Sequence, residues 1–244
     1  MSRFRLKSRD YIGDRKGKLH YNRQLFSAIA SEYSLMSGVL SFGRDIPWKR
    51  RLVERLPELS RPRCLDLACG NGDFTALVLN RYSEAEVTAL DLAAPMLEIA
   101  RERFAEDGRV SFVEADMNAS ELPEESYDLI TVGYGLRNAP QIDRALKEIS
   151  RLLRPEGVLA VLDFSRWNRG DFFELKLLRF WCGLWGLIRS GNADTYGYIA
   201  DSLARYPARG ALHRMFGEHD LDIIDSETHI LGIIEAAIAL KRST

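Results

Sequence analysis

The chain has 244 residues, of which 46% are hydrophobic and 28% are charged. This length fits one large α/β domain, and this composition excludes a disordered, collagen-like or low-complexity chain. The 34 Lys and Arg residues nearly balance the 35 Asp and Glu residues. Because the formal net charge is only −1, no overall positive field recruits nucleic acid, and a dedicated nucleic-acid-binding protein is not indicated.

Cysteine usage and hydropathy give no sign of secretion or of a membrane span. The three cysteines form no paired Cys-x-x-Cys unit, so neither a disulfide framework nor a metal site is predicted. The basic N-terminus is not followed by the apolar stretch of a secretory signal. The longest uncharged apolar run, residues 180–188, is about half of the roughly 20 residues that a span needs. We therefore expect a cytoplasmic protein, with peripheral contact at the inner face of a membrane as an open alternative.

The N-terminal region is predicted to be a flexible basic arm followed by a helical cap. Residues 1–20 are polar and basic, which is typical of an arm. From Asn22 to Met36 the apolar side chains recur at three- and four-residue spacing, the period of an amphipathic helix. A second helix is expected near Pro47, because proline is tolerated in a first helical turn. We assign residues 21–60 to the cap.

After Pro62 short β-type runs alternate with helical stretches. This alternation predicts βαβ units and a parallel sheet with helices on both faces. Strands are expected at 64–68, 86–90, 110–114, 127–132, 158–163, 221–226 and 231–240, and helices at 74–80, 95–104, 141–153, 170–189, 194–204 and 208–217. We assign residues 61–165 to the core and 166–244 to later helices and the final strands of the same single domain, 21–244.

A glycine-containing turn follows the first expected strand, in Asp66-Leu67-Ala68-Cys69-Gly70-Asn71-Gly72-Asp73. Glycine lets the backbone approach a ligand closely, and the helix that opens there offers free N–H donors. The Gly-x-Gly spacing lacks the third glycine of the dinucleotide fingerprint, which favours a smaller adenosyl ligand over a pyrophosphate. A plain tight turn is the alternative.

Acidic residues end the next two expected strands. Asp91 lies about 20 residues beyond the glycine turn, where a carboxylate can accept both ribose hydroxyls of an adenosine. Asp116 could accept the adenine amino group while Met117 packs on the ring. Three acids at successive strand ends, at the edge where open α/β sheets bind ligands, predict a nucleoside site rather than unrelated loop acids.

These motifs resemble those of class I S-adenosylmethionine-dependent methyltransferases and, within that class, the UbiE/MenG ubiquinone and menaquinone biosynthesis C-methyltransferases. The resemblance covers about residues 22–240. Its most specific parts are Gly-Leu-Arg-Asn at 135–138 and the Tyr-x-Tyr block at 196–198. It rests on LFSAIASEYSLMSGVLSFG (25–43), LDLACGNGDFT (65–75), ALDLAAPML (89–97), YDLITVGYGLRNAP (127–140), LLRPEGVLAVLDFS (152–165) and NADTYGYIADSLARYP (192–207).

The resemblance implies a Rossmann-like fold with a mostly parallel seven-stranded sheet, and S-adenosyl-L-methionine as the cofactor. It makes residues 61–165 the cofactor-binding core and 166–244 the substrate side. It also implies a lipophilic quinol as the methyl acceptor, either demethylmenaquinol or a ubiquinol precursor. The expected cofactor-binding residues are Asp66, Gly70, Asn71, Gly72, Asp91, Leu92, Asp116, Met117 and Gly133.

Arg137 lies in the motif that faces the substrate in this family. We expect its permanent cation to stabilise the phenolate that makes a ring carbon nucleophilic. A structural clamp on a carboxylate is the alternative. Tyr196 is expected to orient the acceptor, although packing of one ring face in the core explains the same sequence block. The proton acceptor is not assigned, because no spacing ties any of the four histidines to the site.

Several alternatives stay open. The family's Tyr-Asp and Met-Asn-Asp are here Tyr33-Ser34 and Met36-Ser37-Gly38, and its histidine in the last strand is missing. These departures favour a methyltransferase of the same fold with another aromatic or natural-product acceptor, methylated at carbon, oxygen or nitrogen. A non-catalytic adenosyl-binding subunit is a second alternative, and a nicotinamide-dependent oxidoreductase a third. The apolar block 172–188 could wall an acceptor tunnel, lie against a bilayer or pack on the sheet. A homodimer is also left open.

Overall fold

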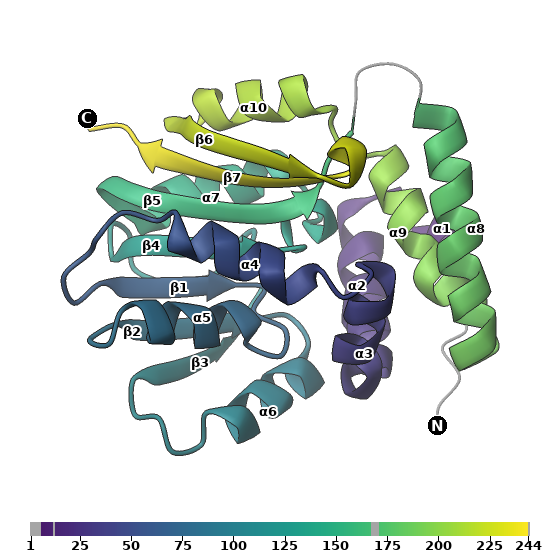
Figure 1. Cartoon of the computed structure of the whole chain (residues 1–244), viewed down its shortest axis with the longest axis horizontal. Coiled ribbons are helices and arrows are strands. Elements are labelled where there is room, and N and C mark those ends of the chain that lie inside the picture. Colours follow the sequence, from purple (N-terminus) through teal and green to yellow (C-terminus); the bar gives the residue numbers. More distant parts are fainter. Residues whose placement is uncertain (1–5, 12, 167–170, 244) are drawn as a thin grey trace.

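The structure is a computed structural model that describes residues 6–11, 13–166 and 171–243. Its centre is a seven-stranded sheet in the order β3-β2-β1-β4-β5-β7-β6 (Figure 1). All neighbouring strands are parallel except β7, which is antiparallel to β5 and β6. The strands are β1 (Arg63–Leu67), β2 (Glu86–Asp91), β3 (Val110–Glu114), β4 (Tyr127–Gly133), β5 (Leu153–Phe164), β6 (Leu221–His229) and β7 (Ile234–Lys241). The predicted Rossmann-like fold is confirmed.

Helices cover both faces of the sheet, as the sequence predicts. Apolar residues of α4 and α5 pack on one face, and those of α7 and α10 pack on the other. Near-continuous burial along β1 and β5 follows from this double cover. The helices after β1 are α5 (Asp73–Arg81), α6 (Ala94–Arg103), η2 (Leu136–Asn138), α7 (Ile142–Leu152), α8 (Asp171–Ser190), α9 (Asp194–Ala204), α10 (Arg209–Glu218) and η3 (Ile230–Gly232).

The prediction of a flexible arm over residues 1–20 is wrong for residues 15–20. Helix α2 begins at Arg15 and ends at Ile29, with Asp14 as its N-cap. Within this stretch Lys18 is held by hydrogen bonds from its Nζ to the carbonyl oxygens of Arg137 and Ala139, at 3.0 and 2.7 Å. Basic composition alone did not show that these cations would be used in packing. Residues 1–5 of the predicted arm lie outside the described residues.

The predicted cap helix over residues 22–36 is divided in the structure. It begins within α2, passes through η1 (Ala30–Glu32) and continues as α3 (Tyr33–Leu40); α4 (Asp45–Glu54) follows, and a short α1 (Ser8–Tyr11) precedes α2. Helices α2 and α3 lie at the carboxyl ends of the parallel strands, beside the hairpin of α8 and α9, whereas α4 lies over a face of the sheet (Figure 1). The cap therefore covers the edge at which open α/β sheets bind ligands.

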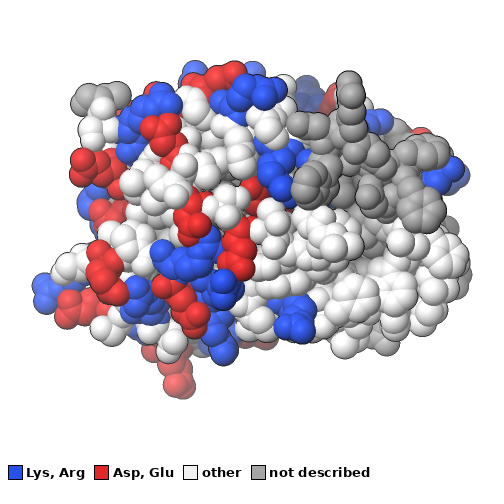
Figure 2. Space-filling model, turned by 45° about the horizontal axis from the view of Figure 1, so that its top comes forward, with Lys and Arg blue, Asp and Glu red and all other residues white. Residues whose placement is uncertain are grey.

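Charge is distributed unevenly over the surface. Figure 2 shows Lys, Arg, Asp and Glu side chains interspersed over the half that contains the sheet, and a broad uncharged area over the helical end. Among the described residues, no single helix is long and apolar enough to cross a membrane. The pair Arg15–Leu40 and Asp45–Glu54 reaches that criterion only when taken together, and it is bent by 84°.

Candidate active site

Two cavities meet at the carboxyl edge of the sheet. The smaller, of about 70 Å³, lies over the ends of β1, β2 and β4, and we call it the cofactor cleft. The larger, of about 300 Å³, lies among the cap helices, α8 and α9, and we call it the acceptor cavity. Phe26, Tyr33, Tyr134 and Asn138 line both. A ligand in one cavity would therefore reach the contents of the other across these four residues.

The cofactor cleft brings together most of the predicted cofactor residues. Its lining includes Gly70, Asp91, Leu92, Asp116, Met117 and Gly133. Leu19, Asn22 and Phe26 of α2 also line it, so the cap helix forms part of its wall. The cleft is thus bounded by the strand ends on one side and by the cap helix on the other.

The glycine turn is shaped by its backbone. Gly70 has φ +56° and Gly72 has φ +78°, the left-handed region that glycine adopts without steric cost. The Gly70 N–H donates to Oδ2 of Asp91 at 2.8 Å. The turn after β1 is thereby fixed to the end of β2, which is the strand that supplies the expected ribose ligand.

Asp91 is oriented by main-chain donors. Its Oδ1 accepts a hydrogen bond from the Ala93 N–H at 2.9 Å, in addition to the Gly70 bond on Oδ2. Burial raises the pKa of the Asp91 carboxyl, and the backbone donors oppose that rise. A carboxylate offers about four lone-pair positions, so these backbone bonds leave acceptor capacity for a ligand hydroxyl. The geometry is suited to the role predicted for Asp91.

Asp116 and Met117 follow the end of β3 and line the cleft. Oδ1 of Asp116 accepts the Asn118 N–H at 2.9 Å, which fixes the carboxylate. Its Oδ2 lies 3.6 Å from a guanidinium nitrogen of Arg15, a residue of the supposed arm. Met117 is buried and lines the cleft. Their roles toward an adenine ring stay a prediction.

Three predicted cofactor residues do not line the cleft. Asp66 is buried beneath the turn, where Oδ2 accepts from the backbone N–H and Oγ1 of Thr75 at 2.9 and 2.7 Å. Burial raises its pKa to about 6. Asn71 donates from Nδ2 to Oγ of Ser34 at 2.8 Å, linking the turn to the cap. Gly72 is the N-cap of α5. In this structure all three shape the turn from outside the cleft.

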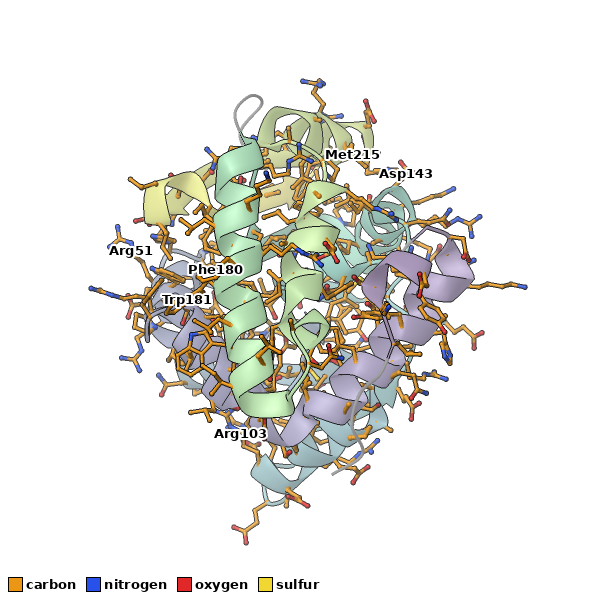
Figure 3. The ribbon with its side chains drawn as sticks, turned by 90° about the vertical axis from the view of Figure 1, so that its right-hand side faces the viewer. Arg51, Arg103, Asp143, Phe180, Trp181 and Met215 are labelled. Carbon is orange, nitrogen blue, oxygen red and sulfur yellow. The ribbon has the colours of Figure 1, made fainter. Side chains whose placement is uncertain are left out.

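The acceptor cavity is almost entirely apolar. Its walls come from α2, α3, the start of α4, the β4–η2 turn, the end of β5, α8, α9 and the β6–β7 connection. Figure 3 looks onto this end of the molecule, where α8 and α9 lie in front and the labelled Trp181 projects from α8. Its side chains include Met36, Phe164, Leu178, Trp181, Cys182 and Ile199. Such a lining suits a lipophilic molecule.

Arg137 is the one cation in the lining of the acceptor cavity. It is buried, with 4% of its surface exposed. Its backbone N–H donates to Oδ2 of Asp163 at 2.9 Å, its Nε lies 3.7 Å from Oδ1 of the same carboxylate, and its Nη1 donates to Oγ of Ser202. The guanidinium also lies 5.0 Å from the centre of the Phe164 ring. Arg137 therefore both contacts Asp163 and lines the cavity.

Tyr196 and Tyr198 belong to α9, and both line the acceptor cavity. The Tyr198 hydroxyl donates to Oδ1 of Asn22 at 2.7 Å, so it ties α9 to the cap. Tyr196 packs in a cluster with Met36 and Cys182. Tyr134, which adopts φ +55° at the end of β4, lines both cavities. Burial raises its pKa well above the usual range.

A buried ion cluster below Tyr134 was not predicted. Nζ of Lys49 donates to Oδ2 of Asp45 at 2.9 Å and to Oδ2 of Asp73 at 3.0 Å. Burial alone would lower the pKa of Lys49, but the two carboxylates raise it above its usual range. The same ammonium lies 5.7 Å from the centre of the Tyr134 ring. Only the i, i+4 spacing of Asp45 and Lys49 was visible in the sequence; the contact with Asp73 requires the fold.

Comparison with known proteins relates the chain to one family. A model of the ubiE/COQ5 methyltransferase family matches residues 14–241. A demethylmenaquinone methyltransferase of Thermus thermophilus is 40% identical over 195 residues, which cover 78% of this chain and 88% of that protein. A ubiquinone/menaquinone biosynthesis C-methyltransferase, UbiE, of Xanthomonas oryzae pv. oryzae is 35% identical over 205 residues, covering 80% of this chain and 79% of that protein.

Solved structures share the fold at lower identity. A chain of the complex between the Haloferax volcanii Trm112 methyltransferase activator and the putative methyltransferase is 14% identical, with a TM-score of 0.66 over 89% of this chain and 98% of that chain. An S-adenosylmethionine-dependent methyltransferase of Aquifex aeolicus is 13% identical, with a TM-score of 0.56 over 79% and 89%. The [4+2]-cyclase SpnF is 17% identical, with a TM-score of 0.63 over 82% and 81%. These likenesses concern the fold alone.

Proposed function

Because the chain belongs to the ubiE/COQ5 methyltransferase family, we propose that it transfers a methyl group from S-adenosyl-L-methionine to a ring carbon of a prenylated quinol. A demethylmenaquinol or a ubiquinol precursor is the acceptor that the named relatives favour. The observation that supports this proposal is the junction of the two cavities. A cleft with two fixed carboxylates meets an apolar cavity with one buried guanidinium, across Tyr33, Tyr134 and Asn138.

The cofactor cleft would hold the nucleoside. Asp91 would accept hydrogen bonds from the ribose hydroxyls, Asp116 would accept the adenine amino group, and Met117 would pack on the ring. When bound, the cofactor supplies an electrophilic methyl group on a sulfonium. The largely apolar lining of the acceptor cavity suits this chemistry because it excludes water from the reacting atoms.

Methyl transfer is an in-line displacement. The carbon–sulfur bond of the donor breaks, a carbon–carbon bond to the acceptor ring forms, and the ring then loses a proton to restore aromaticity. Alignment of the two reactants accounts for most of the rate that a protein can add to such a step. The four residues common to both cavities, including Tyr33 and Tyr134, lie where that alignment would be imposed.

Arg137 would stabilise the phenolate form of the acceptor. A deprotonated hydroxyl places negative charge on the ring, and a guanidinium in a buried, apolar cavity interacts with that charge more strongly than it would in water. The contacts of Arg137 with Asp163 and Ser202 hold it in place before the acceptor arrives. Tyr196 would orient the acceptor from the opposite helix, α9.

Peripheral contact with a membrane is compatible with this proposal but separate from it, because a quinol with a long tail resides in a bilayer. Assembly as a homodimer is likewise a separate proposal. A different aromatic acceptor is the second candidate. Ser34 and Ser37 support it, because these departures from the family pattern contact Asn71 and Asp45 at the edge of the two cavities.

The experiment that tests the proposal is transfer of a labelled methyl group to demethylmenaquinol. We expect label in the quinol fraction, and we expect Arg137→Lys to lower kcat by about 10²-fold, as removal of one oriented donor to a developing oxyanion does elsewhere. Arg55→Lys is the matched control, since Arg55 pairs with Asp225 and Glu227 outside both cavities. An unlabelled quinol would contradict the acceptor, and unchanged turnover of Arg137→Lys would contradict its role. Cofactor binding without turnover on any acceptor would indicate a scaffold subunit.

A further inference from the structure

Helix α8 is apolar on two sides. One side contributes Leu178, Trp181 and Cys182 to the acceptor cavity. The other exposes Leu177, Phe180, Leu184, Leu187 and Ile188, which recur at three- and four-residue spacing and are 39–68% exposed. A surface helix of a protein surrounded only by water has a polar outer side. Figure 3 shows this outer side of α8 facing the viewer, with Phe180 labelled.

Two turns beside α8 also expose large apolar side chains. Phe42, at the α3–α4 turn, is 66% exposed and stacks on Trp181 with ring centres 5.7 Å apart. Leu231, in the β6–β7 connection, is 93% exposed, next to Ile230. All three of Phe42, Ile230 and Leu231 have φ between +45° and +54°, a region in which bulky residues are outliers. Because these side chains are exposed, their burial contributes no free energy that could offset the strain of this backbone conformation.

This outer surface is continuous with the acceptor cavity. Four side chains line the cavity and also belong to the elements that bear the exposed side chains: Phe42, Leu177, Trp181 and Ile230. We call the exposed set the docking face: Phe42, Leu177, Phe180, Leu184, Leu187, Ile188 and Leu231. The cavity therefore opens within an apolar surface.

Charge distinguishes a bilayer from other occupants of the docking face. Across residues 35–50, 176–188 and 230–233 the sequence contains one acidic residue, Asp45, which is buried against Lys49. Arg44, Arg50 and Lys176 are exposed in the same segments. Figure 2 shows the broad uncharged area of this end beside the charged surface of the sheet half. Exposed cations around an apolar surface match the anionic headgroups of a membrane.

A second copy of the chain fits this surface less well. A two-fold dimer would place the same patch of both copies together, so Arg44 and Arg50 would enter an interface with the same cations of the other copy. It would also close the mouth of the acceptor cavity. A bilayer places anionic headgroups beside these cations and leaves the mouth in contact with the phase that dissolves a long-tailed acceptor.

We propose that the docking face lies in the headgroup and upper acyl region of an anionic bilayer, and that the acceptor enters the cavity from the bilayer between Phe42, α8 and the β6–β7 connection. The lateral entry rests on the proposed function, whereas the bilayer contact itself does not. The side chains of Phe42 and Leu231 and the outer side of α8 insert into the bilayer. The quinol ring then passes into the cavity without crossing water.

The test uses the full chain and a variant of residues that do not line either cavity: Phe180→Gln, Leu187→Gln and Leu231→Asn together. Asn is chosen at 231 because it tolerates a left-handed backbone. Ile224→Gln is the control, since Ile224 is 56% exposed on β6, outside the docking face. Circular dichroism and thermal unfolding establish that both variants are folded. Binding is measured by sedimentation with vesicles of phosphatidylcholine and phosphatidylglycerol, without quinol or methyl donor.

We expect the unaltered chain and Ile224→Gln to bind these vesicles, more tightly than vesicles of phosphatidylcholine alone, and the triple variant to bind about tenfold or more weakly. We also expect the triple variant to lose methyl transfer to a long-tailed quinol in vesicles while retaining it on a short-tailed quinol in solution. Equal vesicle binding by all three proteins, or none, would overturn the proposal. So would a dimer of the unaltered chain that the triple variant dissociates without change in vesicle binding.

The two proposals fail separately. Vesicle binding that depends on the docking face, with no label in any quinol, would support the bilayer contact and overturn the proposed acceptor. Label in the short-tailed quinol, with vesicle binding absent, would support the proposed function and overturn the docking face.

Discussion

The cofactor cleft and the acceptor cavity are built by different means. The cleft is formed at the ends of four neighbouring strands, β3, β2, β1 and β4, and its carboxylates are held by main-chain N–H groups, as Asp91 is held by Gly70 and Ala93. The acceptor cavity is formed by side chains from segments up to about two hundred residues apart, joined by contacts such as Tyr198 with Asn22. Local backbone geometry thus defines one region, and long-range side-chain packing defines the other.

This difference implies different responses to substitution. A main-chain framework keeps its shape when one side chain changes, so substitutions in the cleft should affect ligand binding more than stability. The acceptor side depends on buried polar contacts between helices, so substitutions at its junctions should affect stability first. The Lys49 cluster, which joins α4 of the cap to the start of α5, lies at the boundary between the two regions.

Lys49→Met should have the largest effect on stability. It leaves the Asp45 carboxylate buried without its cation, and removal of one partner from a buried ion pair costs about 3–5 kcal/mol. The free energy of unfolding from urea denaturation measures the loss. Asp45→Asn combined with Lys49→Met should recover part of it, because the uncompensated charge is then removed as well. A loss below about 1 kcal/mol would show that the cluster does not join the two regions.

Asp66 should make stability depend on pH. Its pKa is raised by burial from 3.8 to about 6, so the folded chain holds a proton that the unfolded chain releases at lower pH. Its contribution is therefore complete below pH 3.8 and is lost as the pH rises through about 6. Asp66→Asn should reduce this pH-dependent loss in the free energy of unfolding by up to about 3 kcal/mol. Urea denaturation at a series of pH values between the two pKa values measures the difference. An unchanged pH profile would mean that Asp66 is not desolvated.

The same contrast explains how much the sequence could predict. The strands, the glycine turn and the positions of Asp91 and Asp116 follow from local patterns, Gly133 follows from the family resemblance, and the structure places these residues around one cleft. Strand-end position did not reveal that the Asp66 side chain bonds Thr75 beneath the turn, because that requires the orientation of α5.

On the acceptor side the sequence predicted helices but not their partners. The arm was assigned from its basic composition, whereas Nζ of Lys18 donates to the carbonyl oxygens of Arg137 and Ala139. Ser34 and Ser37 were visible only as departures from a family pattern. Their contacts with Asn71 and Asp45 arise from packing between segments, which no local periodicity encodes.

Asp91→Ala should weaken binding of S-adenosylhomocysteine by roughly 1.5–3 kcal/mol, the range for loss of a hydrogen bond to a charged group. Isothermal titration calorimetry measures the change. Asp91→Asn should lose less, because it retains one acceptor oxygen. Glu114→Ala is the matched control: Glu114 ends the next strand, β3, but does not line the cleft. Equal affinity of Asp91→Ala and Glu114→Ala would remove the ribose assignment.

Gly133→Ala should have the smallest of these effects, a loss of about 1–3 kcal/mol of stability from overpacking. A Cβ at this position would lie 2.7 Å from Cε2 and 2.9 Å from Cδ2 of the Phe74 ring. Phe74 is buried, so its ring cannot turn into solvent, and the strand end must shift instead. Because Gly133 lines the cofactor cleft, weaker S-adenosylhomocysteine binding should accompany the loss. Gly108→Ala, where a Cβ meets nothing within 4 Å, should change neither quantity. Equal stability and equal S-adenosylhomocysteine binding of the two variants would show that the close approach of β4 to α5 does not define the cleft. The strand end would then accommodate an added methyl group without loss.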